Sequence, residues 1–200
     1  MTATTFIHTS DFQLGMTRWF LKGEAQGRFN DDREAAIVRL GELAEETGAE
    51  FIVVAGDVFE HNALSREILA RATEMFKRLP VPVYVLPGNH DPLVADSVFY
   101  KASADNVHVI ADSEPIEVAP GVELVGAPYL SKRANHDLVR QALEPLEPAA
   151  GIRIAVGHGQ VDSRSGEDDA DTIDLAFVED CLDRGVIDYL ALGDTHSTAS

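Results

Sequence analysis

The chain has 200 residues, of which 45% are hydrophobic and 25% charged, a composition that excludes disordered, collagen-like and fibrous chains. Its 34 acidic and 16 basic side chains give a formal net charge of −18, which repels polyanions and disfavours broad groove binding to DNA. The sequence contains no apolar run of the roughly 20 residues that a membrane span needs and no secretion signal at its start. The single cysteine, Cys181, can form no intramolecular disulfide and is predicted to be a buried core residue. We therefore expect a cytoplasmic protein without a membrane partner.

Apolar runs of strand length recur along the chain, at residues 4–8, 51–55, 83–86, 107–110, 122–127, 152–156 and 189–192. Helical patterns lie between them, at 31–47 with Gly48 as its C-terminal cap, after Ser65 as far as Pro80, and around 135–143. The close spacing of 107–110, 116–118 and 122–127 suggests antiparallel hairpins in the middle of the chain. Strands that alternate with helices predict an α/β fold with a mixed, mostly parallel sheet.

Side chains that bind metals follow several of these strands directly. The stretches are Ser10-Asp11-Phe12-Gln13, Gly56-Asp57, Gly88-Asn89-His90-Asp91, Gly157-His158 and Gly193-Asp194-Thr195-His196. Because ligands bind at the carboxyl ends of strands in α/β sheets, we expect these loops to converge on one crevice. Oxygen ligands mixed with imidazole suit manganese, magnesium, iron or zinc. A divalent cation would also let an acidic protein bind phosphate.

Each of these signals has a plainer interpretation when it is taken alone. Gly-Asp is a common turn, and an isolated histidine is more often structural than catalytic. The triplet Asn135-His136-Asp137 repeats the letters of the earlier Asn-His-Asp without a preceding strand, so we interpret Asn135 as a helix cap. The acidic segment 162–171 predicts a solvated loop in preference to a calcium site.

The loop after Gly15 carries two adjacent aromatic residues, Trp19 and Phe20, among basic side chains. Such a stretch can contact a nucleic acid strand by stacking. Packing of the loop against the first helix is the favoured expectation.

With these residues in place, the chain resembles the calcineurin-like metallophosphoesterase superfamily. The resemblance covers nearly the whole chain, and its most specific element is Gly88-Asn89-His90-Asp91 after a strand. The stretches around Asp11, Asp57 and Asn89 look like the DNA-repair exonuclease branch, the SbcD-like nuclease subunit. The resemblance implies a mixed-sheet αββα sandwich, with residues 1–200 as one metallophosphoesterase domain that lacks the C-terminal part of the usual fold and any capping region.

The resemblance also implies a centre of two divalent metal ions, with Mn²⁺ preferred over Mg²⁺ or Fe. Asp57 would bridge the ions, Asp11, Gln13 and His196 would bind the first, and Asn89, His158 and Asp194 would bind the second. His90 matches the family's histidine that acts on the scissile phosphate, and Asp91 would hold its ring in orientation. Gln13 and Asp194 stand where the family usually has histidine. These replacements would weaken metal binding at the first site and shift the second site toward Mn²⁺ or Mg²⁺ over softer metals.

The function implied by this resemblance is a metal-dependent phosphodiesterase, a DNA exonuclease or endonuclease acting in DNA repair on DNA ends. The partners expected are an ATPase subunit, bound through a region outside this chain, and a second copy in a homodimer. Two alternatives stay open: a phosphoesterase acting on small phosphoesters or nucleotides, and a scaffold protein with a catalytically reduced centre.

Overall fold

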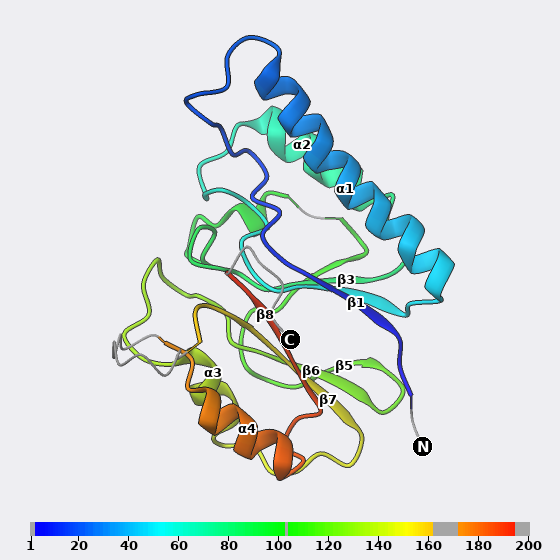
Figure 1. Cartoon of the computed structure of the whole chain (residues 1–200), viewed down its shortest axis with the longest axis vertical. Coiled ribbons are helices and arrows are strands. Elements are labelled where there is room, and N and C mark those ends of the chain that lie inside the picture. The colour runs from blue at the N-terminus through cyan, green and yellow to red at the C-terminus, as the bar shows by residue number, and fades with distance from the viewer. Residues whose placement is uncertain (1–2, 103, 162–171, 195–200) are drawn as a thin grey trace.

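The computed structural model describes residues 3–102, 104–161 and 172–194, arranged as two four-stranded sheets between outer helices (Figure 1). The first sheet has the order β1-β2-β3-β4, and the second has the order β5-β6-β7-β8. The α/β sandwich predicted from the sequence is therefore confirmed. None of the helices in the described ranges has the length and hydropathy that crossing a lipid bilayer requires.

The first sheet is entirely parallel. Its strands are β1 (Phe6–Thr9), β2 (Phe51–Val54), β3 (Val83–Val85) and β4 (Val107–Val109). The prediction of a hairpin at 107–110 is wrong, because this run pairs with β3 in parallel. Apolar periodicity marks a strand but does not determine which neighbour it pairs with.

The second sheet contains the antiparallel pair that the sequence predicts nearby. Its strands are β5 (Ile116–Ala119), β6 (Val122–Gly126), β7 (Ile152–His158) and β8 (Tyr189–Gly193). Strands β5 and β6 form a hairpin, whereas β6, β7 and β8 are parallel. Both sheets thus direct parallel strand ends, and the loops that follow them, toward the candidate site.

Helices α1 (Ala25–Thr47) and α2 (Arg66–Phe76) cover the outer face of the first sheet (Figure 1). Helix α1 begins before the predicted residue 31, because its first turns lack the apolar stripe used to locate it. It ends as expected at Gly48, which is left-handed and donates its backbone N–H to Ala44. The Ser65 side chain accepts from Ile68 and caps α2, as predicted.

Helices α3 (Leu138–Leu143) and α4 (Leu175–Asp183) cover the second sheet, and a short 3₁₀ helix, η1 (Val98–Tyr100), follows β3. The prediction that Asn135 caps α3 is wrong, because the Asp137 carboxylate accepts from Arg140 N and the helix starts after it. Sequence analysis did not predict the nine residues of α4. The acidic segment 162–171, predicted to be a solvated loop, lies outside the described residues. Cys181 is buried in α4, as expected.

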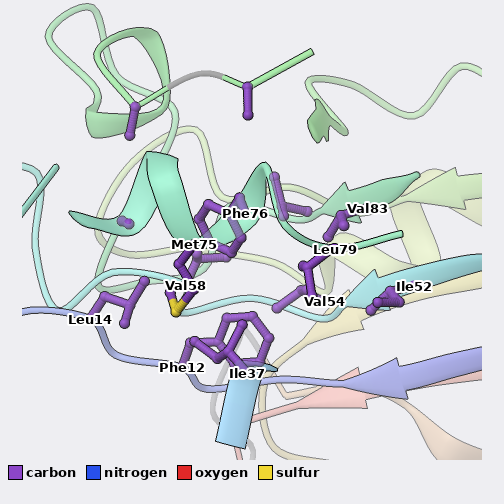
Figure 2. Close-up of a cluster of buried hydrophobic side chains, with 14 of the residues drawn as sticks. Phe12, Leu14, Ile37, Ile52, Val54, Val58, Met75, Phe76, Leu79 and Val83 are labelled. Atoms are coloured by element: carbon purple, nitrogen blue, oxygen red, sulfur yellow. The ribbon is translucent and has the colours of Figure 1, made fainter. Parts of the chain in front are cut away.

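Strand β2 separates two hydrophobic cores because alternate residues point to opposite faces. Ile52 and Val54 pack with α1 and α2, while Phe51 and Val53 pack between the sheets. Figure 2 shows the first of these cores, where side chains of the first sheet, α1, α2 and the adjoining loops meet. Burial on both faces fixes the strand, and hence the loop after it that carries Asp57.

Candidate metal centre

The polar loops after the strands of both sheets meet at one place. Oxygen or nitrogen atoms of Asp11, Asp57 and His158 lie within 4.8 Å of one another. Asp194 joins them from β8, because its backbone N donates to Asp11 Oδ2 at 3.1 Å. The first two strands of one sheet and the last two of the other therefore supply one cluster, as expected for loops at the carboxyl ends of parallel strands.

Asp57 lies in the middle of this cluster and is 3% exposed. Its Oδ1 accepts from the backbone N of His90 at 3.0 Å, and its Oδ2 lies 3.4 Å from His158 Nε2. Burial alone would raise the pKa of Asp57, but the charges and hydrogen bonds of His158 and His90 outweigh it and lower the pKa. Asp57 is thus held as an anion between the loop that carries His90 and the end of β7.

The buried ring of His158 is oriented through its other nitrogen. Nδ1 lies 2.8 Å from the carbonyl oxygen of Ala55, which can only accept, so Nδ1 carries a proton and donates. Nε2 therefore faces Asp57 and, at 3.9 Å, Asp194. Burial opposes the charged ring, yet Asp57, the Ala55 carbonyl and Asp11 together raise the pKa of His158 to about 9. In the protein without metal, a protonated His158 supplies the cation that this acidic cluster needs.

The backbone is strained at the cluster itself. Four non-glycine residues of the described chain have positive φ: Asp11 at 56°, Gln13 at 45°, Asp57 at 54° and Asp194 at 98°. All four were predicted metal ligands. Non-glycine residues rarely adopt this conformation, and such strain persists where the surrounding structure imposes it. Backbone strain thus occurs at the predicted ligands, which indicates that these loops hold their side chains in specific positions.

Two glycines let the loops approach this closely. A Cβ on Gly88 would collide with the backbone N and Oδ1 of Asp57, and a Cβ on Gly56 would collide with the ring of His158. Gly56 also has a φ of +88°. The glycines that precede these polar residues are therefore required by close packing of loop against loop.

Gln13 is placed beside Asp57 by its backbone. Its N–H donates to the Asp57 carbonyl at 2.8 Å, and its own carbonyl accepts from Arg33 of α1 at 2.5 Å. The residue is 5% exposed. His196, the remaining predicted ligand, lies outside the described residues.

Asp91 does not make the contact expected of it, which was with the ring of His90. The ring of His90 has its Nδ1 3.0 Å from the carbonyl oxygen of Glu60, and its Nε2 lies 4.0 Å from Asp57 Oδ2. The carboxylate of Asp91 accepts instead from the backbone N–H groups of Phe59 at 2.8 Å and Gly88 at 2.7 Å. Asp91 thus joins the loop that follows β2 to the loop that follows β3. The ring of His90 is held instead by the backbone carbonyl of Glu60.

Asp91 is fully buried, and burial raises its pKa to about 7 although both backbone amides favour the ionised form. Glu60 was missed as a site residue. Its Oε1 also lies 3.9 Å from His90 Nδ1. The signal available in the sequence was its place in Gly56-Asp57-Val58-Phe59-Glu60, in a loop expected to follow a strand.

The donor set fits divalent metal ions. Within the described part of the chain, Asn89 Oδ1 and His158 Nε2 are buried atoms without a hydrogen-bond partner. Buried polar atoms normally have partners, so the Asn89 oxygen indicates an absent ligand, whereas His158 Nε2 has its ion pair with Asp57 at 3.4 Å in place of a hydrogen bond. A carboxyl pair, an amide oxygen and an imidazole nitrogen match the preferences of Mn²⁺, Fe²⁺ or Zn²⁺ more closely than those of Ca²⁺.

Comparisons with known proteins agree with this geometry. The family model for calcineurin-like phosphoesterase matches residues 4–198. An uncharacterized metallophosphoesterase, YhaO of Bacillus subtilis (strain 168), is 26% identical over 98% of this chain and 49% of its own length. SbcD, a component of the nuclease SbcCD of Staphylococcus epidermidis, is 23% identical over 95% of this chain and 56% of its own length. The chain therefore spans about half the length of these curated relatives.

Two further similarities are more limited. The DNA double-strand break repair protein Mre11 of Archaeoglobus fulgidus is 32% identical over 48% of this chain and 21% of its own length. The crystal structure of Pseudomonas putida nuclease MPE matches 73% of this chain and 57% of its own with a TM-score of 0.36 and 17% identity. The family model covers almost the whole sequence, including every strand that supplies the cluster. This chain belongs to the calcineurin-like phosphoesterase family.

Proposed function

We propose that this chain is a DNA-cleaving phosphodiesterase that works with two divalent cations, Mn²⁺ first among them. The observation that carries the proposal is Asp57, a buried carboxylate that lies between His90 and His158 and within the same cluster as Asp11. Asp11, Gln13 and His196 would hold one cation, Asn89, His158 and Asp194 would hold the other, and Asp57 would bridge them. The names of two relatives, a nuclease component and a DNA double-strand break repair protein, favour DNA as the substrate.

When bound, the cations would neutralise phosphate charge and supply activated water. The chain's own contribution at the leaving group is His90, whose side chain is 41% exposed. The Glu60 carbonyl accepts from Nδ1, so Nδ1 keeps one proton and Nε2 lies 4.0 Å from Asp57 Oδ2. In its protonated form His90 can then donate from Nε2 to a phosphate or leaving oxygen.

The test measures metal stoichiometry and cleavage together. Metal-free protein is titrated with Mn²⁺ by calorimetry, and hydrolysis of an end-labelled DNA and of bis(p-nitrophenyl) phosphate is then followed. We expect two equivalents of Mn²⁺ in the wild type, and loss of both equivalents and of both activities in Asp57→Asn. Asp112→Asn is the matched control, because Asp112 also accepts a backbone N–H, from Glu114, but is exposed. Wild-type cleavage by Asp57→Asn would refute the proposal.

A second substrate class is favoured by one observation, the net charge of −18, which disfavours long-range attraction of DNA. A small phosphoester or nucleotide needs no such attraction. The same assay separates the two, because a hundredfold preference for the small ester over DNA would assign the centre to small substrates. Failure of the folded wild type to bind any Mn²⁺ would instead support the scaffold interpretation.

We also propose that this protein works with a partner in the cytoplasm. The SbcCD relative is named as one subunit of a nuclease, which favours a partner subunit for this chain as well. The family resemblance favours an ATPase as that partner, or a second copy of the chain. We propose a cytoplasmic location, and one domain over residues 1–200.

A further inference from the structure

The loop between β1 and α1 exposes an aromatic pair. Trp19 is 93% exposed and Phe20 is 58% exposed, and their rings make an edge contact with centroids 5.8 Å apart. The expectation that this loop packs against the first helix therefore does not hold for its two aromatic side chains. Burial of a large aromatic side chain is favourable by roughly 2–3 kcal/mol, so two adjacent exposed ones point to a binding surface.

The base of this loop is fixed to α1 and to the metal centre. Gln26 of α1 donates to the Met16 carbonyl at 3.1 Å and accepts from the Arg18 backbone N at 2.9 Å. Arg33, further along α1, donates to the carbonyl of Gln13 and lies over the ring of Phe29. The aromatic pair is thus presented on an anchored loop, at the end of the molecule where α1 begins (Figure 1).

Two basic side chains, Arg18 and Lys22, flank the aromatic pair on this loop, and Arg28 follows in the first turn of α1. From Gly15 to Arg28 the charged side chains are Arg18, Lys22 and Arg28, against the single acid Glu24, which pairs with Arg28 at 3.3 Å. This local excess of positive charge stands in a protein of net charge −18. Charge and aromatic exposure therefore coincide on one segment.

We propose that Trp19 and Phe20 form a stacking platform for unpaired bases of a nucleic acid strand that enters the metal centre. This inference rests on the proposed function, whose substrate it narrows to single-stranded DNA or a single-stranded end. Each base offers a π face whatever its identity, while Arg18 and Lys22 can meet the phosphates beside it. Bases in the interior of a duplex are stacked on both faces, so the platform favours unpaired bases.

The distance between platform and centre suits this role. Trp19 follows Gln13 by six residues, so the extended chain limits their separation to about 20 Å. Single-stranded sites in other folds extend over roughly 4–16 nucleotides. A strand bound at the platform can therefore also occupy the centre.

The test uses the fact that Trp19 is the only tryptophan of the chain. Metal-free wild-type protein in EDTA is titrated with oligodeoxythymidylate of about 16 nucleotides, and the quenching of tryptophan fluorescence is measured. Anisotropy of the labelled oligonucleotide then gives the affinity of each variant. We expect saturable quenching, and affinity at least about fivefold weaker in Trp19→Ala and in Phe20→Ala. Tyr100→Ala, which removes an aromatic side chain 65% exposed outside the loop, should retain wild-type affinity.

Three outcomes overturn the proposal: no binding of the oligonucleotide, equal affinity in wild type and Trp19→Ala, or equal affinity for a duplex of the same length. The first would leave a protein partner as the occupant of the pair. Wild-type hydrolysis of bis(p-nitrophenyl) phosphate with Mn²⁺ is measured in parallel. Hydrolysis without platform-dependent binding refutes the platform alone, whereas platform-dependent binding without any hydrolysis refutes the proposed function.

Discussion

Raising the pH should destabilise the metal-free protein through His158. Its pKa is raised from 6.5 to about 9 in the folded state, where Asp57, Asp11 and Asp194 face it and the Ala55 carbonyl accepts from it. A raised folded-state pKa gives stability that is fully present below 6.5 and is lost as the pH rises through about 9. Each pKa unit corresponds to about 1.4 kcal/mol, so the whole loss amounts to about 3 kcal/mol.

The assay is urea unfolding in EDTA, monitored by circular dichroism between about pH 6 and pH 10. We expect the free energy of unfolding of the wild type to fall by about 3 kcal/mol over this range, and that of His158→Gln to change by much less. His136→Gln is the matched control, because His136 is exposed. Equal pH dependence in wild type and His158→Gln would refute the reasoning. The same proton must leave when metal binds, so calorimetry at about pH 7.5 should record proton release on addition of Mn²⁺ to the wild type.

Three substitutions test the other contacts of the centre. Asp91→Ala leaves the buried backbone amides of Phe59 and Gly88 without acceptors, so it should lower the melting temperature by about 5 °C or more. An unchanged melting temperature would contradict the role of Asp91 in joining the two loops. Gly88→Ala forces a methyl group onto Asp57 and should abolish Mn²⁺ binding measured by calorimetry; retained binding would show that the loops can separate. His90→Ala should lower kcat by about 10²- to 10⁴-fold while Mn²⁺ affinity stays within about threefold, and a parallel loss of metal would make His90 a ligand instead.

The positions of the polar residues were predictable because they depend on strand ends, which apolar runs locate well. Asp11, Asp57 and His158 follow such runs and meet as expected. Strand pairing was less predictable. The run at 107–110 has the length and composition of a hairpin strand, yet it pairs in parallel with β3, a choice made by tertiary packing.

The partner of a buried carboxylate could not be deduced from its neighbours in the sequence. The family resemblance implied that Asp91 orients the ring of His90, but its carboxylate accepts from the backbone of Phe59 and Gly88 instead. Glu60 was missed for the converse reason, because its main contact with His90 is made by a backbone carbonyl, which every residue type has. The positive φ of Asp57 could not be predicted from its residue type either, because aspartate occurs in turns of several kinds.

Each sheet is built from one contiguous half of the chain, and this division has a consequence for folding. The strands of the first sheet all precede residue 110, and those of the second all follow residue 115. Each half can therefore form its sheet from strand pairings within itself, whereas the cluster needs Asp57 from one half and His158 from the other. The centre comes into existence only when the halves dock. Divalent metal should accordingly slow the separation of the halves more than the fraying of either one, so that metal release and loss of tertiary structure share one rate.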